Sequence, residues 1–262
     1  MPEYKPFRLL DGDYGKGLLL LADHATNFVP EHYGALGLAP ENFDRHIAYD
    51  IGIEPLTEAL SAMLGIPAVL SCFSRLLIDP NRGEDDPTLV MKLSDGAIVP
   101  RNHPMSEADR QERINTYYAP YHRAIDEATA KVADKSGKAP LIISLHSFTP
   151  FWKGVARPWQ AGVLWDNDPR AVTPMIAGLK AMGYETGNNE PYDGALKGDT
   201  MYKHCMRHGV PHALLEVRQD LIANDEGVRE WANALAPLLE NMNSDPALHE
   251  IKVFPSRTGP YE

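Results

Sequence analysis

Short, continuous apolar runs recur along the chain, and each ends in polar residues or glycine. They occupy residues 17–22, 68–70, 76–78, 140–146, 162–165 and 212–217. Uninterrupted apolar runs of strand length, unlike alternating ones, are typical of strands covered on both faces of a sheet. We therefore predict buried strands at these positions.

A helical period separates these runs. Between residues 53 and 64, apolar side chains recur every three or four positions, and Gly65-Ile66-Pro67 follows as a stop signal. Similar patterns predict helices over 106–133, with an interruption at Pro120, and over 169–182, 199–208 and 224–242. Residues 83–104 are rich in Gly, Asp and Pro, which predicts a long surface excursion.

Strands and helices alternate along most of the chain, the pattern of an α/β sandwich with a mostly parallel sheet. No repeat, low-complexity tract or linker interrupts the alternation. The simplest organisation is therefore one domain spanning residues 1–262.

The composition indicates which partners are disfavoured and in which compartment the protein works. The net charge of −11 disfavours nucleic acid and anionic membranes, because no basic stripe offsets the repulsion. Cys72 and Cys205 form neither a disulfide framework nor a metal-type pair, which indicates a reducing compartment. No apolar stretch approaches the ~20 residues that span a bilayer, and residues 1–6 lack the pattern of a signal peptide. We expect a cytoplasmic protein.

Functional side chains follow four of the predicted strands. They are His24, the corner from Asp79 to Arg82, His146, and Glu216 with Arg218. In open α/β sheets, ligands bind at the carboxyl ends of the strands. Histidine, carboxylate and arginine at four such ends therefore predict a shared site, although any strand must end somewhere in polar residues.

The two histidines are candidate metal ligands. A lone histidine after a strand is more often one that caps a turn through the backbone. His24 and His146, however, follow similar strands, and neutral imidazole is the commonest metal-ligating side chain. The chain has neither His-x-x-His nor Cys-x-x-Cys spacing, so any metal site is assembled from distant segments.

The corner Asp79-Pro80-Asn81-Arg82 has two interpretations. Asp, Pro and Asn are ordinary turn residues. Alternatively, Asn81 and Arg82 form an anion clamp, because guanidinium binds a carboxylate with two hydrogen bonds and the carboxamide adds a neutral donor. Arg75, earlier in the same segment, is a candidate for a second positive charge.

Glu216 has two interpretations. It is placed to activate water beside a bound metal ion, or to form an ion pair with Arg218 or Arg82.

His46 and Asp50 are four residues apart, so they share one face if this segment is helical. They form either a surface ion pair or two groups that face one pocket.

The sequence disfavours serine hydrolases of the α/β-hydrolase kind and enzymes that bind dinucleotides or nucleoside triphosphates. Ser147 follows His146, but no Gly-x-Ser-x-Gly nucleophile elbow occurs. The phosphate-binding motifs Gly-x-Gly-x-x-Gly and Gly-x-x-x-x-Gly-Lys are also missing, which disfavours dinucleotide and nucleoside-triphosphate chemistry.

Five blocks together resemble the N-formylglutamate amidohydrolase family, and the resemblance extends from about residue 18 to residue 221. The blocks are His24-Ala25 with Pro30, His46-Ile47-Ala48-Tyr49-Asp50-Ile51-Gly52, Ser74-Arg75-Leu76-Leu77-Ile78-Asp79-Pro80-Asn81-Arg82, His146-Ser147-Phe148-Thr149-Pro150 and Glu216-Val217-Arg218-Gln219-Asp220.

The resemblance implies a fold and a set of roles. The family is similar in turn to the zinc carboxypeptidase and aspartoacylase group, which implies a three-layer αβα sandwich with a mostly parallel mixed sheet. By resemblance, His24 and His146 bind zinc or another divalent metal, and Glu216 is the general base. Asn81 and Arg82 hold a substrate carboxylate, for which Arg75 and Arg218 are further candidates.

Two positions depart from the wider zinc group. Asn27 stands three residues after His24, where that group has a glutamate ligand. Ser144 stands two residues before His146, where it has an aspartate that supports the histidine. Asp50 is the candidate replacement for the lost carboxylate ligand, and the carbonyl oxygen of Asn27 is a weaker alternative.

The function implied is a metal-dependent amidohydrolase that removes a formyl or short acyl group from a carboxylate-bearing N-acyl amino acid such as N-formylglutamate. Two alternatives remain open. One is a non-catalytic member that binds an anionic metabolite, which the substitutions Asn27 and Ser144 favour. The other is an amidase for a different N-acyl amino acid or a small peptide, with a pocket shaped by residues 83–104 and 152–159.

Overall fold

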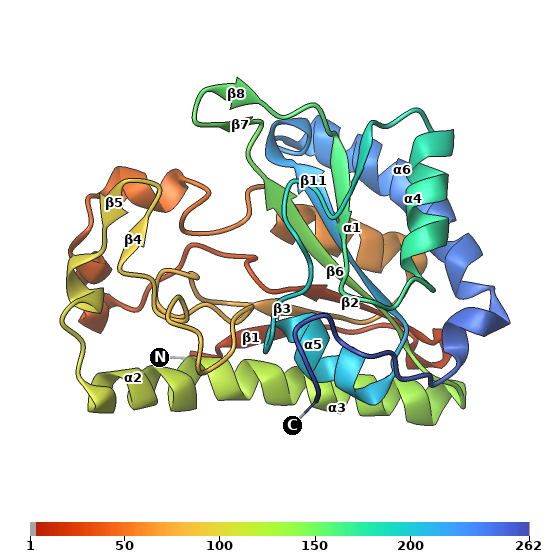
Figure 1. Ribbon diagram of the computed structural model, residues 1–262, viewed down its shortest axis with the longest axis horizontal. Coiled ribbons are helices and arrows are strands. Elements are labelled where there is room, and N and C mark those ends of the chain that lie inside the picture. Colours follow the sequence, from red (N-terminus) through yellow and green to blue (C-terminus); the bar gives the residue numbers. More distant parts are fainter. Residues whose placement is uncertain (1–3, 262) are drawn as a thin grey trace.

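A computed structural model describes residues 4–261 and contains one seven-stranded sheet (Figure 1). In spatial order its strands are β1 (Phe7–Leu10), β3 (Ala68–Ser71), β2 (Leu18–Ala22), β6 (Leu141–Phe148), β11 (His212–Arg218), β9 (Ala161–Leu164) and β10 (Thr186–Asn188). Neighbouring strands are parallel except at two places, where β1 runs antiparallel to β3 and β9 runs antiparallel to β11. The sheet is therefore mixed and mostly parallel.

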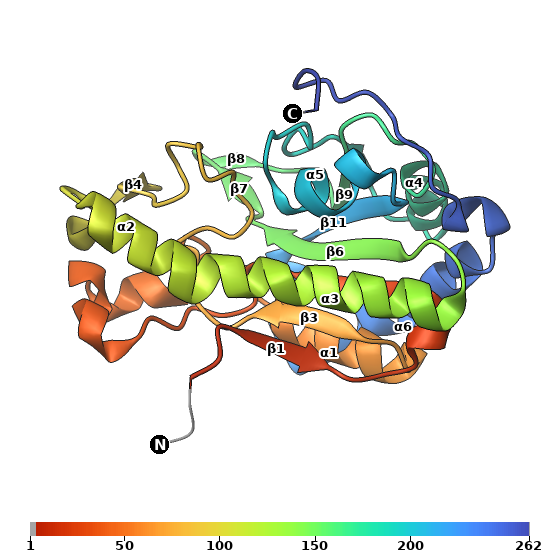
Figure 2. The same cartoon turned by 90° about the horizontal axis from the view of Figure 1, so that it is seen from below.

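Helices cover both faces of this sheet, so the fold is the three-layer αβα sandwich that the resemblance implied. The α-helices are α1 (Ile53–Leu64), α2 (Glu107–Arg113), α3 (Ala119–Ser136), α4 (Val172–Ala181), α5 (Thr200–His204) and α6 (Asp225–Asn243). Figure 2 shows α3 lying along one face, with α1 and α6 behind the sheet. Short stretches of 3-10 helix occupy Tyr14–Lys16, Pro40–Asp44, Pro100–Asn102, Met206–His208, Gln219–Leu221 and Pro246–His249, and Glu31–Gly37 is irregular, with left-handed backbone at residues 34–36.

Strand β2 shows why the central strands are apolar throughout. Leu18, Leu20 and Ala22 belong to the core cluster that packs against α1, α4 and α6. Leu19 and Leu21 belong to the second cluster, on the α3 side. Successive side chains of a strand point to opposite faces, and because both faces are covered here, every position is buried.

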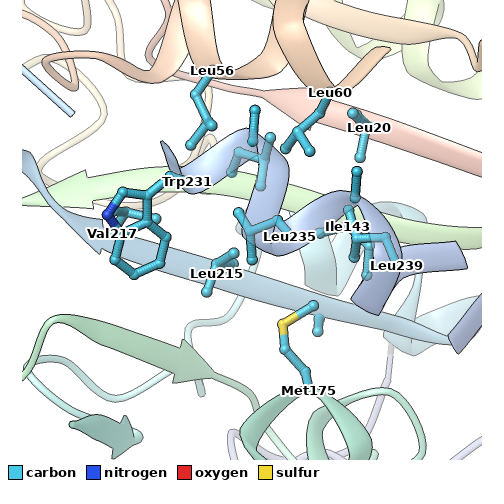
Figure 3. Packing of buried hydrophobic residues seen from close by; sticks show 14 of the residues in the cluster. Leu20, Leu56, Leu60, Ile143, Met175, Leu215, Val217, Trp231, Leu235 and Leu239 are labelled. Atoms are coloured by element: carbon cyan, nitrogen blue, oxygen red, sulfur yellow. The ribbon is translucent and has the colours of Figure 1, made fainter. Parts of the chain in front are cut away.

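Helix α6 contributes one apolar stripe to the first cluster. Trp231, Leu235 and Leu239 are four residues apart and each is at most 2% exposed. Figure 3 shows them between the α1 side chains Leu56 and Leu60 and the sheet. This spacing explains why the sequence pattern located the helix to within one residue at each end.

The predicted helix over 106–133 is two α-helices joined by a π-helical turn. Ser106 accepts a hydrogen bond from the Asp109 N–H and caps α2, as expected from the sequence. The π-turn Ile114–Tyr118 then leads into α3, which continues to Ser136. Pro120 lies in the first turn of α3, directly after the π-turn, and the backbone before it keeps helical dihedral angles, so the proline does not end the rod.

The strand predicted over residues 76–78 is wrong. These residues form a turn, in which the Ser74 hydroxyl accepts from the Leu76 N–H and the Ser74 carbonyl accepts from the Leu77 N–H. Leu76, Leu77 and Ile78 are nevertheless fully buried under neighbouring loops. The apolar run correctly indicates that these side chains are buried, but burial alone does not specify an extended backbone.

Two short hairpins complete the described part of the chain. Residues 83–104 contain the β4 (Leu93–Ser94) and β5 (Ala97–Ile98) pair, and β7 (Phe151–Trp152) pairs with β8 (Val155–Ala156). In Figure 1 both hairpins stand beyond one end of the central strands. Within residues 4–261 no helix combines the length and the apolar character needed to cross a bilayer. Residues 1–3, part of the segment examined for a signal peptide, lie outside the described residues.

Candidate functional site

His24, Asp50 and His146 converge at one end of the central strands. His24 follows β2, His146 lies near the end of the adjacent β6, and the Asp50 backbone N–H donates to the His24 carbonyl at 2.9 Å. The three side chains are almost fully buried. Asp50 Oδ2 lies 3.4 Å from Nδ1 of His24 and 2.9 Å from Nδ1 of His146. One donor atom from each residue lies within 4.8 Å of the others.

The far nitrogen of each imidazole faces a second buried carboxylate. His24 Nε2 lies 2.7 Å from Asp79 Oδ1, and His146 Nε2 lies 3.1 Å from Asp23 Oδ2. A carboxylate acceptor holds the imidazole proton on Nε2, which leaves the Nδ1 lone pair available to a metal ion. Both histidines are therefore oriented with Nδ1 toward Asp50.

The supporting carboxylates are themselves held in place. Asp23 accepts hydrogen bonds from the hydroxyls of Tyr121, Ser144 and Thr200. Burial by itself would raise the pKa of Asp23, but the hydrogen bond to His146 and the nearby imidazoles lower it to about 2.

Asp79 binds the Arg75 guanidinium, whose Nε and Nη2 donate to Asp79 Oδ2 at 3.2 and 2.8 Å. Burial opposes ionisation of this carboxyl too, but the Arg75 charge and the His24 imidazole keep its pKa well below the usual range. Both supports are therefore ionised at neutral pH.

This donor set fits a divalent metal ion. Two imidazole nitrogens and one carboxylate oxygen, with a further position open to water or substrate, are the ligands typical of catalytic zinc. Each imidazole already has the carboxylate partner that such ligands require. His24, Asp50 and His146 could therefore hold the metal.

All three residues line a cavity of about 370 Å³. Glu216, Arg75, Asn81 and Arg82 line the same cavity, so the structure brings together seven of the eight site residues predicted from the sequence. The exception is Arg218, which is not among the lining residues.

Glu216 projects from β11, where its backbone pairs in register with that of His146. It is 6% exposed, and its Oε2 atom has no hydrogen-bond partner among the described residues. Burial raises the pKa of Glu216 to about 7. A buried carboxylate whose pKa lies near neutral pH, and which has an oxygen without a hydrogen-bond partner, is suited to accept a proton from water.

Asn81 and Arg82 form a donor pair on the same cavity. The Asn81 carboxamide oxygen accepts the Thr200 N–H at 3.0 Å, which orients the Nδ2 donors the other way. Arg82 Nη1 donates to the Asn81 carbonyl and Nε to the Thr88 hydroxyl, which leaves Nη2 to contact a ligand. An amide and a guanidinium in this position can bind a carboxylate.

The two further arginines are less available. Arg75 reaches the cavity, but Nε and Nη2 bind Asp79 and Nη1 lies 3.4 Å from Asp50. Arg218 pairs with Asp220 and donates to the carbonyls of Arg157 and Trp159. We therefore leave Arg218 out of the site proposed below.

Other residues considered from the sequence have distinct places. His46 lines the cavity, but the segment from His46 to Asp50 is a series of turns and not a helix. The Asn27 amide donates to the Phe43 carbonyl and takes no part in the His–Asp–His group. Ser144 donates to Asp23, and Ser147 donates to the Ile51 carbonyl, so neither hydroxyl is a free nucleophile.

Sequence reasoning missed Asp23 and Asp199, and it did not assign the role of Asp79. Asp23 precedes His24 directly, which was a usable signal, but its partner His146 lies on another strand. Asp199 lines the cavity at the start of α5 and gave no motif signal. An aromatic wall of Phe148, Trp152 and Tyr192, which also lines the cavity, was not identified as a unit.

Comparisons with known proteins identify the family and similar folds. The model of the N-formylglutamate amidohydrolase family matches residues 16–223. Among solved structures, the chain is similar to the Agrobacterium tumefaciens gene product Atu2144, with 30% identity and a TM-score of 0.85 over 92% of this chain and 96% of that one. It is also similar to the N-formylglutamate amidohydrolase from Ralstonia eutropha JMP134, with 24% identity and a TM-score of 0.71 over 92% and 97% of the two chains. No curated protein sequence matches significantly.

Proposed function

Because the chain belongs to the N-formylglutamate amidohydrolase family and is thus a hydrolase of amide bonds, we propose that it removes a formyl or short acyl group from N-acyl amino acids, using a zinc ion held by His24, Asp50 and His146. The observation that carries this proposal is the convergence of those ligand atoms on the cavity that Glu216, Asn81 and Arg82 also line. Another divalent metal with the same preference for nitrogen and oxygen ligands would serve the same role.

Substrate binding follows from the donor pair. The Asn81 amide and the Arg82 guanidinium would hold the α-carboxylate of the N-acyl amino acid through charge-assisted hydrogen bonds. Arg75 would act mainly by keeping Asp79 ionised and by contributing positive charge beside Asp50. A zinc ion held by His24, Asp50 and His146 would supply Lewis-acid polarisation of the scissile carbonyl and would acidify the attacking water.

Glu216 would then carry the proton. Its unpartnered Oε2 takes a proton from the attacking water as the oxygen adds to the carbonyl carbon. The same proton passes to the leaving nitrogen as the C–N bond breaks, which gives the carboxylic acid of the acyl group and the free amino acid. Glu216 thereby returns to its ionised form. At neutral pH the acid then releases its own proton, and the amine of the amino acid takes one up.

We also propose that the protein works in the cytoplasm. Cys72 and Cys205 are both free thiols, and Cys205 is fully buried. Unpaired cysteines of this kind support a reducing compartment.

Elemental analysis together with hydrolysis of N-formyl and N-acetyl amino acids tests this function. We expect near-stoichiometric metal in the wild type and its loss in both His24→Ala and His146→Ala. Glu216→Gln should retain metal and fold but lose roughly 10²–10⁴ in kcat, the contribution expected of a general base. Glu185→Gln, at an exposed glutamate, is the matched control.

Two results would count against the proposal. Full turnover by Glu216→Gln on every active substrate would remove Glu216 as the base. A wild type that binds no metal even after reconstitution, and hydrolyses none of these amides, would favour a protein that only binds an anionic metabolite.

A further inference from the structure

The cavity extends beyond the Asn81–Arg82 pair into a recess formed by Leu164, Leu196, Leu214 and Asp199. These four residues also line an adjoining small space of about 10 Å³, which admits little more than a water molecule. The recess adjoins the carboxylate clamp, because the Thr200 N–H, next to Asp199 in the chain, donates to Asn81 Oδ1. A substrate held by its α-carboxylate would therefore place its side chain here.

Asp199 is the charged group in this otherwise apolar recess. It is 4% exposed, and its Oδ1 accepts the Tyr202 N–H at 2.6 Å as the N-cap of α5. Within residues 4–261 no ion pair with a lysine, arginine or histidine engages its carboxylate, Oδ2 takes part in no side-chain hydrogen bond, and Asp199 lines the cavity. Burial raises the pKa of Asp199 to about 7, because desolvation outweighs the Tyr202 N–H bond and the nearby positive charges of Arg82 and His146.

A glutamate side chain would find little positive charge in this recess. Of the two arginines that line the cavity, Arg75 binds Asp79 and Arg82 is needed for the α-carboxylate. A second substrate carboxylate would then meet Asp199 in a desolvated space, where two carboxyl groups cannot both stay ionised, so its binding would require one of them to take up a proton. The three leucines, by contrast, suit an aliphatic stem.

We propose that Asp199 determines specificity, and that the enzyme prefers N-acyl amino acids whose side chain carries an N–H donor on an aliphatic stem, as in glutamine, ornithine or lysine, over N-acylglutamate. Such a side chain packs its methylene groups on the leucines and donates to the free oxygen of Asp199. This inference rests on the proposed function, since it concerns the amino-acid part of the same substrates.

The test compares N-formyl-L-glutamine with N-formyl-L-glutamate, which have nearly the same shape, and adds N-formyl-L-ornithine. For the wild type we expect kcat/KM to favour glutamine over glutamate by roughly 10²-fold, because the site leaves a buried polar group unpaired with the wrong substrate. Asp199→Asn should bring the two within about fivefold of each other and reduce turnover of the ornithine substrate.

The variant is designed to fold. Asparagine caps helices as well as aspartate does, so the contact to the Tyr202 N–H is retained. Asp245→Asn is the matched control, because Asp245 is an exposed N-cap that accepts the Ala247 N–H far from the cavity. This control should keep the wild-type preference.

Calorimetric binding of the same three ligands separates this inference from the proposed function. Turnover with glutamate equal to or better than glutamine, or an unchanged ratio in Asp199→Asn, would overturn the role of Asp199 while leaving amide hydrolysis intact. Selective binding of the glutamine ligand without any turnover would retain the role of Asp199 and overturn the hydrolase proposal.

Discussion

Asp23 adjoins His24 in the chain, yet its Oδ2 atom lies 3.1 Å from Nε2 of the other imidazole, His146. The two strands are neighbours in the sheet, so the end of β2 supplies both one candidate ligand and the support for the ligand on β6. Asp23 thereby gives His146 the carboxylate partner that Ser144, two residues before it in the chain, does not supply. Ser144 itself donates to Asp23, so the serine belongs to the same network.

This relationship predicts the effect of Asp23→Asn on the metal. The variant replaces the anionic partner of His146 Nε2 by a neutral amide, and loss of such a partner typically weakens metal affinity 10–100-fold. Competition with a chromophoric chelator measures the change. Ser144→Ala, which removes a neutral hydroxyl that donates to Asp23 and lies 3.1 Å from His146 Nε2 but leaves the anionic partner in place, should change affinity by less than about threefold. Equal affinities in wild type and Asp23→Asn would show that Asp23 does not support the metal site.

Asp199 should also control stability as a function of pH. Its folded-state pKa is raised to about 7, whereas the unfolded carboxyl ionises near its ordinary value of 3.8. The unfolded state therefore releases its proton first, and the wild type loses stability as the pH rises from about 4 to about 7. Asp199→Asn lacks this titration, so its free energy of unfolding relative to wild type should increase across that window and be constant above it.

Urea unfolding of the metal-free proteins at intervals from pH 4 to 8 measures this difference. Asp245→Asn again provides the control, because its side chain is exposed and should show little change. A difference between wild type and Asp199→Asn that does not vary with pH would contradict the raised pKa.

For His122 we expect the opposite dependence of stability on pH. It is 8% exposed, its Nδ1 lies 2.8 Å from His204 Nε2, and its Nε2 has no partner among the described residues. Burial, together with the adjacent His204, lowers its pKa to about 3. Because the unfolded imidazole binds a proton near pH 6.5, stability is full above that pH and falls as the pH drops toward 3.

His122→Gln removes this titration and should flatten the acid side of the stability profile between about pH 6.5 and pH 3, even if it lowers stability at pH 7. Thermal melts over that range measure the slope. His32→Gln, at an exposed histidine, should leave the slope unchanged. Parallel profiles for wild type and His122→Gln would disprove the assignment.

Arg157 is a positioning residue for the aromatic wall. It is 8% exposed, donates to the Tyr192 hydroxyl at 3.0 Å, and its guanidinium carbon lies 5.0 to 5.7 Å from the ring centroids of Tyr192, Trp152 and Phe148. Lysine cannot reproduce both the planar stacking and the hydrogen bonds. Arg157→Lys should therefore raise KM about tenfold and change kcat less than threefold.

Steady-state kinetics with the best N-acyl substrate measures that division between KM and kcat. Arg123→Lys, at an exposed arginine, should leave both constants unchanged. A fall in kcat with constant KM would mean that the wall acts on the chemical step and not on substrate binding.

Much of the fold was predictable because local patterns and tertiary packing agree. The run from Leu18 to Ala22 became β2, and the helical period over 53–64 became α1 with the same bounds. The pattern failed at Leu76–Leu77–Ile78, where loops bury a turn as completely as a sheet buries a strand. The edge strands β1 and β10 were missed because they are short and carry no continuous apolar run.

The candidate site was also predictable only in part. By itself the sequence determined that His24, His146 and Glu216 stand near the ends of central strands, because strand ends are local features, and parallel strands direct those ends to one edge of the sheet. The corner with Asn81 and Arg82 reaches the same cavity from a turn that the sequence mistook for a strand. Only the tertiary structure decided that Asp23 supports His146, that Asp79 supports His24, and that Arg218 points elsewhere. Those outcomes depend on side-chain directions and on contacts between segments separated by up to 123 positions, and no local pattern encodes such contacts.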